Sequence, residues 1–215
     1  MLKLKVCGMK DSANIAALVE LQPDFIGFIF YEKSSRFVGD DLDIDLLKSF
    51  PKHIKKVGVF VNASPDTILK TVKKYDLRYV QLHGSETPDF CKTLKMRGMS
   101  IIKAFAVDET FNFSMVNNYK PHCDFFLFDA KGAHPGGNGV AFDWELLRNY
   151  DNDKPFFLSG GLDLQNIEAL TNEMDGMKIY GVDVNSKFET APGQKDVEMI
   201  RNLMNTLRHV EAEVE

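Results

Sequence analysis

The sequence has 215 residues, a length that suits one domain with a substantial core. Apolar residues make up 44% and charged residues 27%, which is ordinary for a globular protein, and a net charge of −5 without a basic, aromatic-rich stripe excludes a typical nucleic-acid partner. Three cysteines cannot all pair in disulfides, which favours a reducing compartment. No apolar run approaches the ~20 residues of a membrane helix, and the charged N-terminus is too short for a signal peptide. We therefore expect a cytoplasmic protein with no membrane partner.

Eight short apolar runs recur along the chain, and turn residues and a helical pattern follow each of them. Several runs are apolar at nearly every position, which is typical of parallel strands that are covered on both faces. We predict strands at residues 2–7, 25–30, 57–61, 79–82, 101–107, 125–128, 156–158 and 179–184.

Helix-start signals lie between these runs. Asp11, Ser64 and Thr87 each supply a side chain that can cap a helix, and a proline follows the last two at the first helical position. Apolar residues at i, i+3 and i+7 spacing predict a final helix over residues 197–207. Residues 109–119 lack such a stripe, so we expect a short or irregular element there.

The eight βα units predict a single (β/α)8 TIM barrel over residues 1–215, with a frayed acidic tail at residues 211–215. A doubly wound sheet commonly has five or six parallel strands, whereas a barrel needs eight and at least about 200 residues. Functional groups of such a barrel lie where the strands end and the following loops begin.

Two reactive side chains stand at predicted strand ends. Cys7 ends the first strand and Gly8 follows it, so the thiol should face the mouth of the barrel, although a lone cysteine on a strand is more often a buried structural residue. Asp129 directly follows the sixth strand, where it could cap a turn or donate a proton to a ligand. The sequence shows no permanent cationic partner for Cys7.

The loops after the seventh and eighth strands form the usual phosphate site of barrel enzymes, because glycine lets backbone N–H groups approach an anion closely. Gly160 and Gly161 follow the seventh strand, and Asn185 and Ser186 follow the eighth. Lys187 could add a charge to the same anion or could be a solvated lysine.

Other loops offer substrate contacts. Gly136, Gly137 and Gly139 lie in a long loop after the sixth strand, which could cover a bound substrate or serve only as a flexible connection. Arg36 follows the second strand; loop arginines are usually solvated, yet the planar guanidinium suits a carboxylate ligand.

Gln81 and His83 end the fourth strand at alternate positions and therefore point the same way. His83 is either a satisfied structural histidine or a substrate contact. The five histidines show none of the spacings of metal-binding motifs, so we expect no metal.

Together these segments resemble the phosphoribosylanthranilate isomerases, barrel enzymes of tryptophan biosynthesis, over nearly the whole chain. Any one segment is weak alone, but their order along the chain makes the resemblance specific. In chain order they are Lys5-Val6-Cys7-Gly8, Ser34-Ser35-Arg36, Val57-Gly58-Val59-Phe60-Val61-Asn62, Val80-Gln81-Leu82-His83-Gly84, Asp129, Gly136-Gly137-Asn138-Gly139 with Phe142-Asp143-Trp144, Ser159-Gly160-Gly161-Leu162, Gly181-Val182-Asp183-Val184 and Ala191-Pro192-Gly193-Gln194-Lys195-Asp196.

The resemblance implies an Amadori rearrangement of N-(5-phosphoribosyl)anthranilate to 1-(2-carboxyphenylamino)-1-deoxyribulose 5-phosphate, with no cofactor, by a monomer or homodimer. Asp129 would be the general acid that opens the sugar ring, and Cys7 the general base that removes the C2 proton. Arg36 would bind the anthranilate carboxylate. The loops of Gly160, Gly161 and Ser186 would bind the phosphate.

Two positions depart from the family pattern. Asn185-Ser186-Lys187 stands where Ser-Ser-Gly is more usual, and Asn138 stands where Thr or Ser is usual. Lys187 cannot adopt the backbone conformations of glycine freely, so we expect a different geometry in the phosphate loop.

Two alternative functions carry different sequence requirements. A pentose-phosphate epimerase would need a cluster of His and Asp metal ligands at the strand ends, and this sequence lacks one. An indole-glycerol-phosphate synthase would need lysines and glutamates at the strand ends that here hold Cys7 and Asp129. A non-catalytic barrel that binds a phosphorylated metabolite would need neither of these two side chains.

Overall fold

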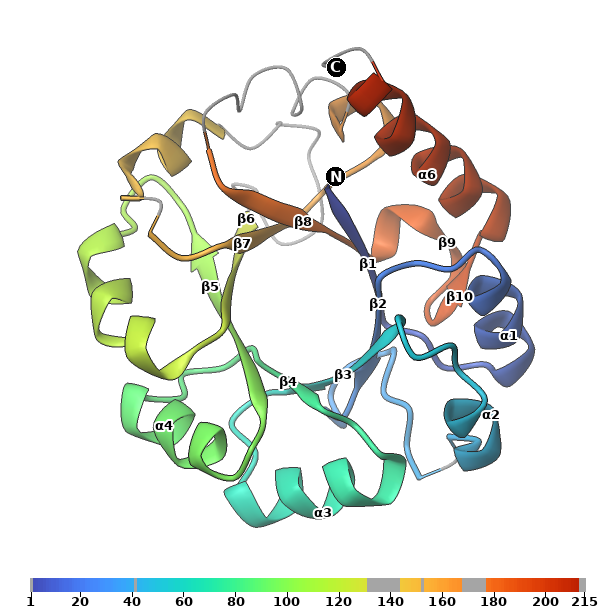
Figure 1. The fold of residues 1–215 in the computed structure, drawn as a ribbon, viewed down its shortest axis with the longest axis horizontal. Coiled ribbons are helices and arrows are strands. Elements are labelled where there is room, and N and C mark those ends of the chain that lie inside the picture. Colours follow the sequence, from blue (N-terminus) through green and yellow to red (C-terminus); the bar gives the residue numbers. More distant parts are fainter. Residues whose placement is uncertain (1, 41, 131–143, 152, 168–176, 213–215) are drawn as a thin grey trace.

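The computed structural model describes residues 2–40, 42–130, 144–151, 153–167 and 177–212. Eight parallel strands form a closed barrel in chain order, and helices surround it, which confirms the predicted TIM barrel (Figure 1). The strands are β1 Lys3–Cys7, β2 Phe25–Ile29, β3 Lys55–Phe60, β4 Tyr79–Leu82, β5 Ser100–Val107, β6 Phe125–Ala130, β7 Phe156–Ser159 and β8 Ile179–Val184.

The strand ends differ from the prediction by one or two residues. β3 begins at Lys55 instead of Val57, because the chain already pairs with β2 there. β6 includes Asp129 and ends at Ala130, since β5 continues alongside it to Val107. Asp129 therefore belongs to strand β6 and not to the loop that follows, and the hydrogen bonds of the sheet hold its backbone in place.

The outer layer contains the expected helices. Asp11, Ser64 and Thr87 accept hydrogen bonds from the backbone N–H three residues further on, which confirms all three predicted caps. The α-helices are α1 Ser12–Glu20, α2 Ile44–Lys48, α3 Pro65–Tyr75, α4 Pro88–Met96 and α6 Val197–Ala212.

Shorter elements complete the layer. Between β5 and β6 the chain forms two 3-10 turns, Phe113–Asn118 and Lys120–His122, which confirms the prediction of an irregular element there. A third turn, Trp144–Asn149, precedes β7. Helix α6 reaches Ala212, so residues 211 and 212 of the tail predicted to fray are helical, and residues 213–215 lie outside the described chain.

A small aromatic cluster fills the barrel interior near the start of the strands. A cluster separate from the main core consists of Phe25, Val57, Ile102, Ala104, Leu127 and Phe157, and their neighbours along each strand point outward to the helices. The rings of Phe25 and Phe157 meet edge to face, with their centroids 5.2 Å apart. This apolar packing closes one end of the barrel, so a ligand can enter at the other end, where the strands finish.

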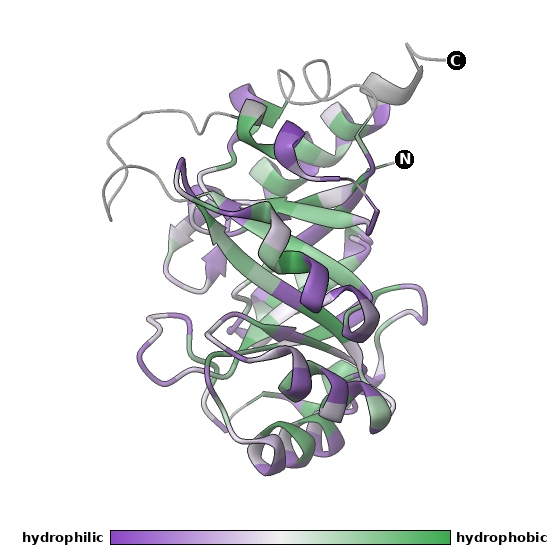
Figure 2. Ribbon diagram, turned by 90° about the vertical axis from the view of Figure 1, so that its left-hand side faces the viewer, coloured by the Kyte–Doolittle hydropathy of each residue, from purple (hydrophilic) through white to green (hydrophobic). Residues whose placement is uncertain are grey.

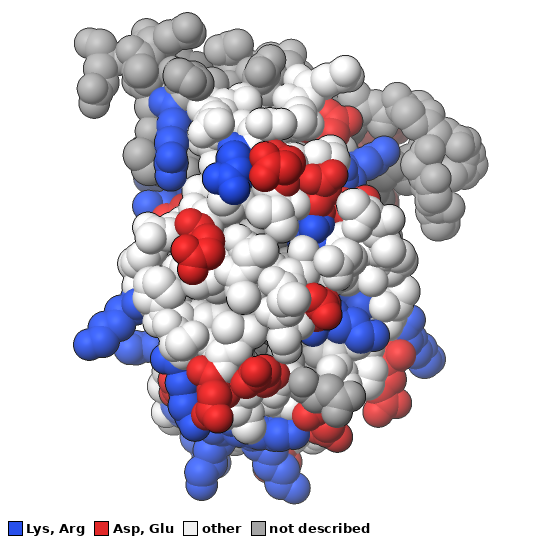
Figure 3. All heavy atoms as spheres, turned by 90° about the vertical axis from the view of Figure 1, so that its right-hand side faces the viewer, with Lys and Arg blue, Asp and Glu red and all other residues white. Residues whose placement is uncertain are grey.

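Polar and charged side chains lie mainly on the outside. Figure 2 shows apolar strands surrounded by helices whose polar residues alternate with apolar ones. On the face in Figure 3, basic side chains lie next to acidic ones, which gives no basic surface of the kind that nucleic acids bind. Among the described residues, none of the helices combines the length and the apolar character that crossing a bilayer requires.

Candidate active site

A pocket opens at the carboxyl ends of the barrel strands, where the fold predicts function. Its wall receives residues from strands across the whole barrel, together with the loops that follow β7 and β8. The structure brings eight of the predicted site residues to this wall: Cys7, Gln81, His83, Asp129, Gly160, Gly161, Asn185 and Ser186.

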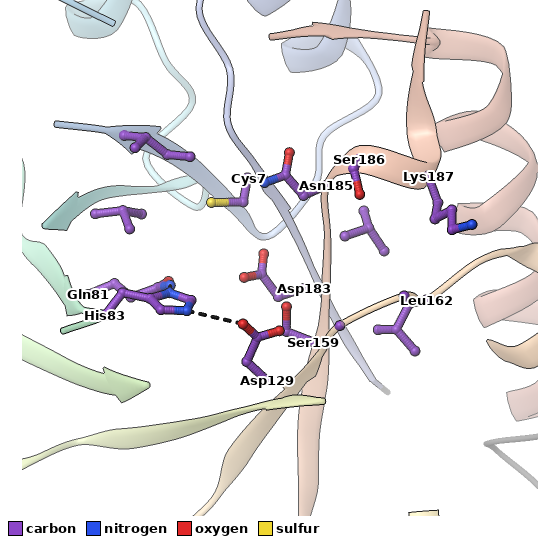
Figure 4. A pocket seen from close by; sticks show the side chains of 15 residues that line it. Cys7, Gln81, His83, Asp129, Ser159, Leu162, Asp183, Asn185, Ser186 and Lys187 are labelled. Carbon is purple, nitrogen blue, oxygen red and sulfur yellow. Dashed lines mark hydrogen bonds and ion pairs between the residues drawn. The ribbon is translucent and has the colours of Figure 1, made fainter. Parts of the chain in front are cut away.

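Cys7 ends β1 with its side chain directed into the pocket (Figure 4). Only 4% of the residue is exposed. Gly27 is its partner on β2, and a Cβ atom there would lie 2.9 Å from the Cys7 sulfur, so glycine makes room for the thiol. Burial raises the pKa of the Cys7 thiol, and the nearby charge of Lys5 opposes that rise.

Lys5 is the cation beside Cys7 that sequence reasoning did not identify. Its ammonium group lies 2.8 Å from Asp183 Oδ2, and the lysine side chain is fully buried. Burial acts to lower the pKa of Lys5, but the charges of Asp183 and Cys7 prevail and raise it. A signal was present, because Lys5 stands two positions before Cys7 on a strand and so faces the same way.

His83 lies between Gln81 and Asp129. The amide Nε2 of Gln81 is 2.9 Å from His83 Nδ1, and His83 Nε2 is 3.2 Å from Asp129 Oδ2 (Figure 4). With the amide donating to Nδ1, the ring proton lies on Nε2 and is donated to Asp129 Oδ2, which leaves Oδ1 able to carry the proton of a carboxylic acid. His83 is therefore a direct partner of Asp129, and Gln81 sets its tautomer.

Two glycines shape the loop after β7. Gly160 has φ +94° and Gly161 has φ +66°, which lie in the region that favours glycine. A Cβ atom on Gly160 would lie 2.4 Å from the carbonyl oxygen of Ala130, the residue after Asp129. The close approach of this loop to β6 therefore requires glycine at position 160.

Lys187 does not strain the loop after β8. Among the described residues, positive φ angles outside glycine occur only at Gln22, Asn62 and Asp76. The segment Ser186–Phe188 forms a 3-10 turn in the ordinary right-handed region. Lys187 therefore needs none of the backbone conformations that favour glycine, and a different geometry of the phosphate loop stays a prediction.

Arg36 lies beside the pocket and does not belong to its described wall. Its guanidinium pairs with Glu189, with Nε 2.9 Å from Oε1 and Nη2 2.6 Å from Oε2. A Cβ atom on Gly8 would lie 2.7 Å from the Arg36 Cδ atom, so the side chain passes over Gly8, next to Cys7. The guanidinium is thus paired with a carboxylate of the protein itself, and its predicted contact with the carboxylate of a ligand stays a prediction.

Glu189 and Lys195 belong to a small antiparallel ribbon, β9 Glu189–Ala191 and β10 Gln194–Lys195, that follows β8. The Lys195 ammonium is 2.5 Å from Glu189 Oε1 and 2.8 Å from Asn185 Oδ1. Burial acts to raise the pKa of Glu189, but its hydrogen bonds and charge interactions with Arg36 and Lys195 prevail and hold that pKa below its ordinary value. Lys195, from the last resembling segment, which sequence reasoning left without a role, therefore anchors Asn185 and also holds Glu189, the partner of Arg36.

The glycine-rich segment after β6 lies outside the described residues. It contains Gly136, Gly137 and Gly139, which were predicted to cover the substrate, and Asn138, the second departure from the family pattern.

Comparison with known proteins gives one consistent result. The family model for N-(5'-phosphoribosyl)anthranilate (PRA) isomerase matches residues 4–206. A curated N-(5'-phosphoribosyl)anthranilate isomerase from Parabacteroides distasonis is 41% identical over 207 residues, which cover 96% of this chain and 93% of that protein.

Solved structures agree with this match. The crystal structure of phosphoribosyl anthranilate isomerase from Thermotoga maritima superposes with a TM-score of 0.84 at 31% identity, covering 97% of this chain and 100% of that one. A further structure, with a TM-score of 0.81 at 29% identity and the same coverage, is a complex with reduced 1-(o-carboxyphenylamino)-1-deoxyribulose 5-phosphate.

Proposed function

The chain belongs to the N-(5'-phosphoribosyl)anthranilate isomerase family of tryptophan biosynthesis, and we propose that Cys7 and Asp129 are the general base and general acid of its Amadori rearrangement. One observation carries these roles: a thiol from β1 and a carboxyl group from β6 enter the same pocket at the carboxyl ends of the strands. Both types of group can exchange protons with a sugar bound between them.

The first step is ring opening. Asp129 donates a proton to the furanose ring oxygen, the bond from that oxygen to C1 breaks, and the nitrogen lone pair forms the C1=N iminium. Asp129 is then a carboxylate, and the Nε2–H group of His83, 3.2 Å away, stabilises it. Gln81 supports this step by keeping the ring proton on Nε2.

The second step is removal of the C2 proton. The iminium withdraws electrons from C2, so the Cys7 thiolate can take this proton and leave an enolamine. The thiol then returns a proton to C1, the C2 hydroxyl releases its proton to leave a ketone, and Asp129 takes one up. Both groups return to their starting states, and because carbon is oxidised at C2 and reduced at C1, the balance requires no nicotinamide or flavin.

Activation of Cys7 is the costly part of this cycle. A thiol of ordinary pKa needs ~2 kcal/mol to ionise at pH 7, and burial adds to that cost. Lys5 offsets part of the cost through its charge. The positive iminium offsets more, and because it exists only after the ring has opened, it favours the thiolate at the moment when the C2 proton has to be removed.

The two ends of the substrate carry negative charges that different elements can bind. We infer that the phosphate lies against the loops of Gly160, Gly161 and Ser186, and that Arg36 binds the anthranilate carboxylate. Glu189 occupies the Nε–Nη2 edge of Arg36, so the substrate would use the Nη1 side. The relative that binds a reduced phosphorylated product supports this class of ligand.

We infer that the protein acts in the cytoplasm as a monomer or homodimer. The described pocket wall comes from a single barrel, so one copy supplies both the acid and the base.

Paired substitutions test the assigned roles. Cys7→Ala and Asp129→Asn should each reduce kcat by about 10²–10⁴-fold, the usual contribution of a proton-transfer group. Binding of the reduced product should be kept, because these groups act on the reaction and not on the charged ends of the ligand. Loss of the substrate's anthranilate fluorescence measures turnover.

Matched controls separate these roles from general damage. Cys91→Ala removes another buried thiol, and Asp124→Asn neutralises a carboxylate at the opposite end of β6; neither residue lies in the described pocket wall. Both should keep turnover close to that of the unsubstituted protein. Undiminished turnover in Cys7→Ala or Asp129→Asn would contradict the role assigned to that residue. A wild-type protein that binds the reduced product but does not convert the substrate would favour the non-catalytic alternative.

A further inference from the structure

Asp183 is a buried carboxylate of the pocket wall that the cycle described above does not use. It is 5% exposed, and its Oδ2 atom accepts from the Lys5 ammonium at 2.8 Å. Its Oδ1 atom is also buried, and no described residue donates a hydrogen bond to it. A buried acceptor without a donor is unfavourable, so this oxygen is suited to a donor that arrives with the ligand.

The carboxylate is held in place from behind. Lys5 and Asp183 are register partners on β1 and β8, which close the barrel against each other. In Figure 4 the Asp183 side chain lies between Cys7 and Asp129, the two groups that must reach the sugar. The unpartnered oxygen is therefore placed where the reacting part of the substrate has to lie.

The chemistry of the substrate limits what can bind there. Its phosphate and carboxylate are anions that a carboxylate repels, and its ring oxygen is only an acceptor. The sugar hydroxyls and the amine N–H are the donors. Because Cys7 removes the proton from C2, the hydroxyl on that same carbon is the donor brought next to Cys7, and Asp183 is the neighbouring acceptor.

We propose that Asp183 is a further substrate-binding residue, whose Oδ1 atom accepts a hydrogen bond from the C2 hydroxyl, and that Lys5 is the positioning residue that holds this carboxylate. The contact rests on the proposed function, since it assumes that C2 lies beside Cys7. It orients the C2–H bond toward the thiol. It also strengthens as the enolamine becomes a ketone, because the O–H group grows more acidic, so it favours the transition state over the bound substrate. The proton count of the cycle is unchanged, because Asp183 only accepts a hydrogen bond.

Two ligands that are not turned over test the proposal. One is the reduced product, which carries a hydroxyl at C2, and the other is the same molecule without that hydroxyl. A hydrogen bond to a charged group predicts that the wild-type protein binds the hydroxylated ligand roughly 10- to 100-fold more tightly. Isothermal titration calorimetry gives this ratio, and a wild-type ratio near one overturns the proposal.

A matched pair of variants locates the contact. Asp183→Asn should reduce the ratio at least fivefold, because a neutral hydrogen bond is weaker than a charged one. Glu86→Gln should keep the wild-type ratio, because Glu86 forms a comparable buried pair with Lys103, at 3.2 Å, outside the described pocket wall. An unchanged ratio in folded Asp183→Asn overturns the proposal, as does an equal loss in Glu86→Gln.

A second variant keeps the test decisive if Asp183→Asn does not fold, since that substitution leaves Lys5 without a counter-charge. The double variant Lys5→Met, Asp183→Leu replaces the ion pair by apolar side chains of similar volume, which proteins often tolerate. Its ratio should fall close to one, and a ratio at the wild-type value overturns the proposal. Neither ligand undergoes reaction, so these results do not depend on whether Cys7 and Asp129 hold the catalytic roles given above.

Discussion

Neighbouring glycines in the loop after β7 allow a prediction whose size follows from the structure. Gly161→Ala places a side chain at φ +66°, where nothing lies within 4 Å of the new Cβ atom. The cost is then conformational only, about 1–2 kcal/mol of the free energy of unfolding. Gly160→Ala carries the same kind of cost at φ +94° and also brings Cβ to 2.4 Å from the oxygen and 2.6 Å from the nitrogen of Ala130. These are backbone atoms that cannot rotate away, so overpacking should raise the total to about 2–5 kcal/mol.

The functional effect should follow the same order. Relief of the Gly160→Ala contact requires β6 to move at Ala130, and Asp129 precedes that residue directly. A displaced acid group should lower kcat/KM on the order of 10²-fold. Gly161→Ala leaves β6 in place and should lower kcat/KM much less.

Urea unfolding followed by circular dichroism measures the stabilities, and the fluorescence assay measures kcat/KM. If the two variants lose the same stability and activity, the close approach of Gly160 to β6 does not shape the site.

Three further predictions concern binding, protonation and metal independence. Arg36→Met should raise KM by roughly 10- to 100-fold, as expected for lost hydrogen bonds to a charged group, with a smaller change in kcat. The affinity of this variant for a reduced product that lacks the anthranilate carboxylate should equal that of the wild-type protein. An unchanged KM would argue against the contact. Since burial raises the pKa of Cys7 and the base must be ionised, kcat/KM should rise with pH toward a limb that lies above the ordinary pKa of a thiol. The limb of kcat should lie at lower pH, because the iminium forms only in the bound complex, and measured profiles with the opposite order would contradict this role of Cys7. Turnover should persist in EDTA, and its loss there, reversed by added divalent metal, would favour the epimerase alternative.

Much of the fold follows from local patterns. Runs such as residues 125–128 are apolar at every position, which indicates a strand covered on both faces, and Ser64 and Thr87 cap helices that begin with proline. These features depend on residues close together in the chain, so a sequence displays them directly. The missing α-helix between β5 and β6 was visible in the same way, through the lack of an apolar stripe.

The candidate residues Cys7 and Asp129 were also accessible from the sequence, because strand ends of a barrel lie at its mouth. The bonds around them were not. Lys5 and Asp183 stand 178 positions apart, and Arg36 and Glu189 stand 153 apart. Strand alternation indicates that Lys5 faces the same way as Cys7, but it does not reveal Asp183 as the partner of Lys5, and Glu189 looks like one acidic residue among many.

The order of residues therefore determined which segments become strands and which side chains stand at their ends. Closure of β8 against β1 decided which of those side chains meet, since it brings the last strand beside the first and pairs charges that no local pattern connects. The physical reason is that the alternation of a strand specifies the direction of a side chain, whereas its partner depends on the register between strands distant in the sequence.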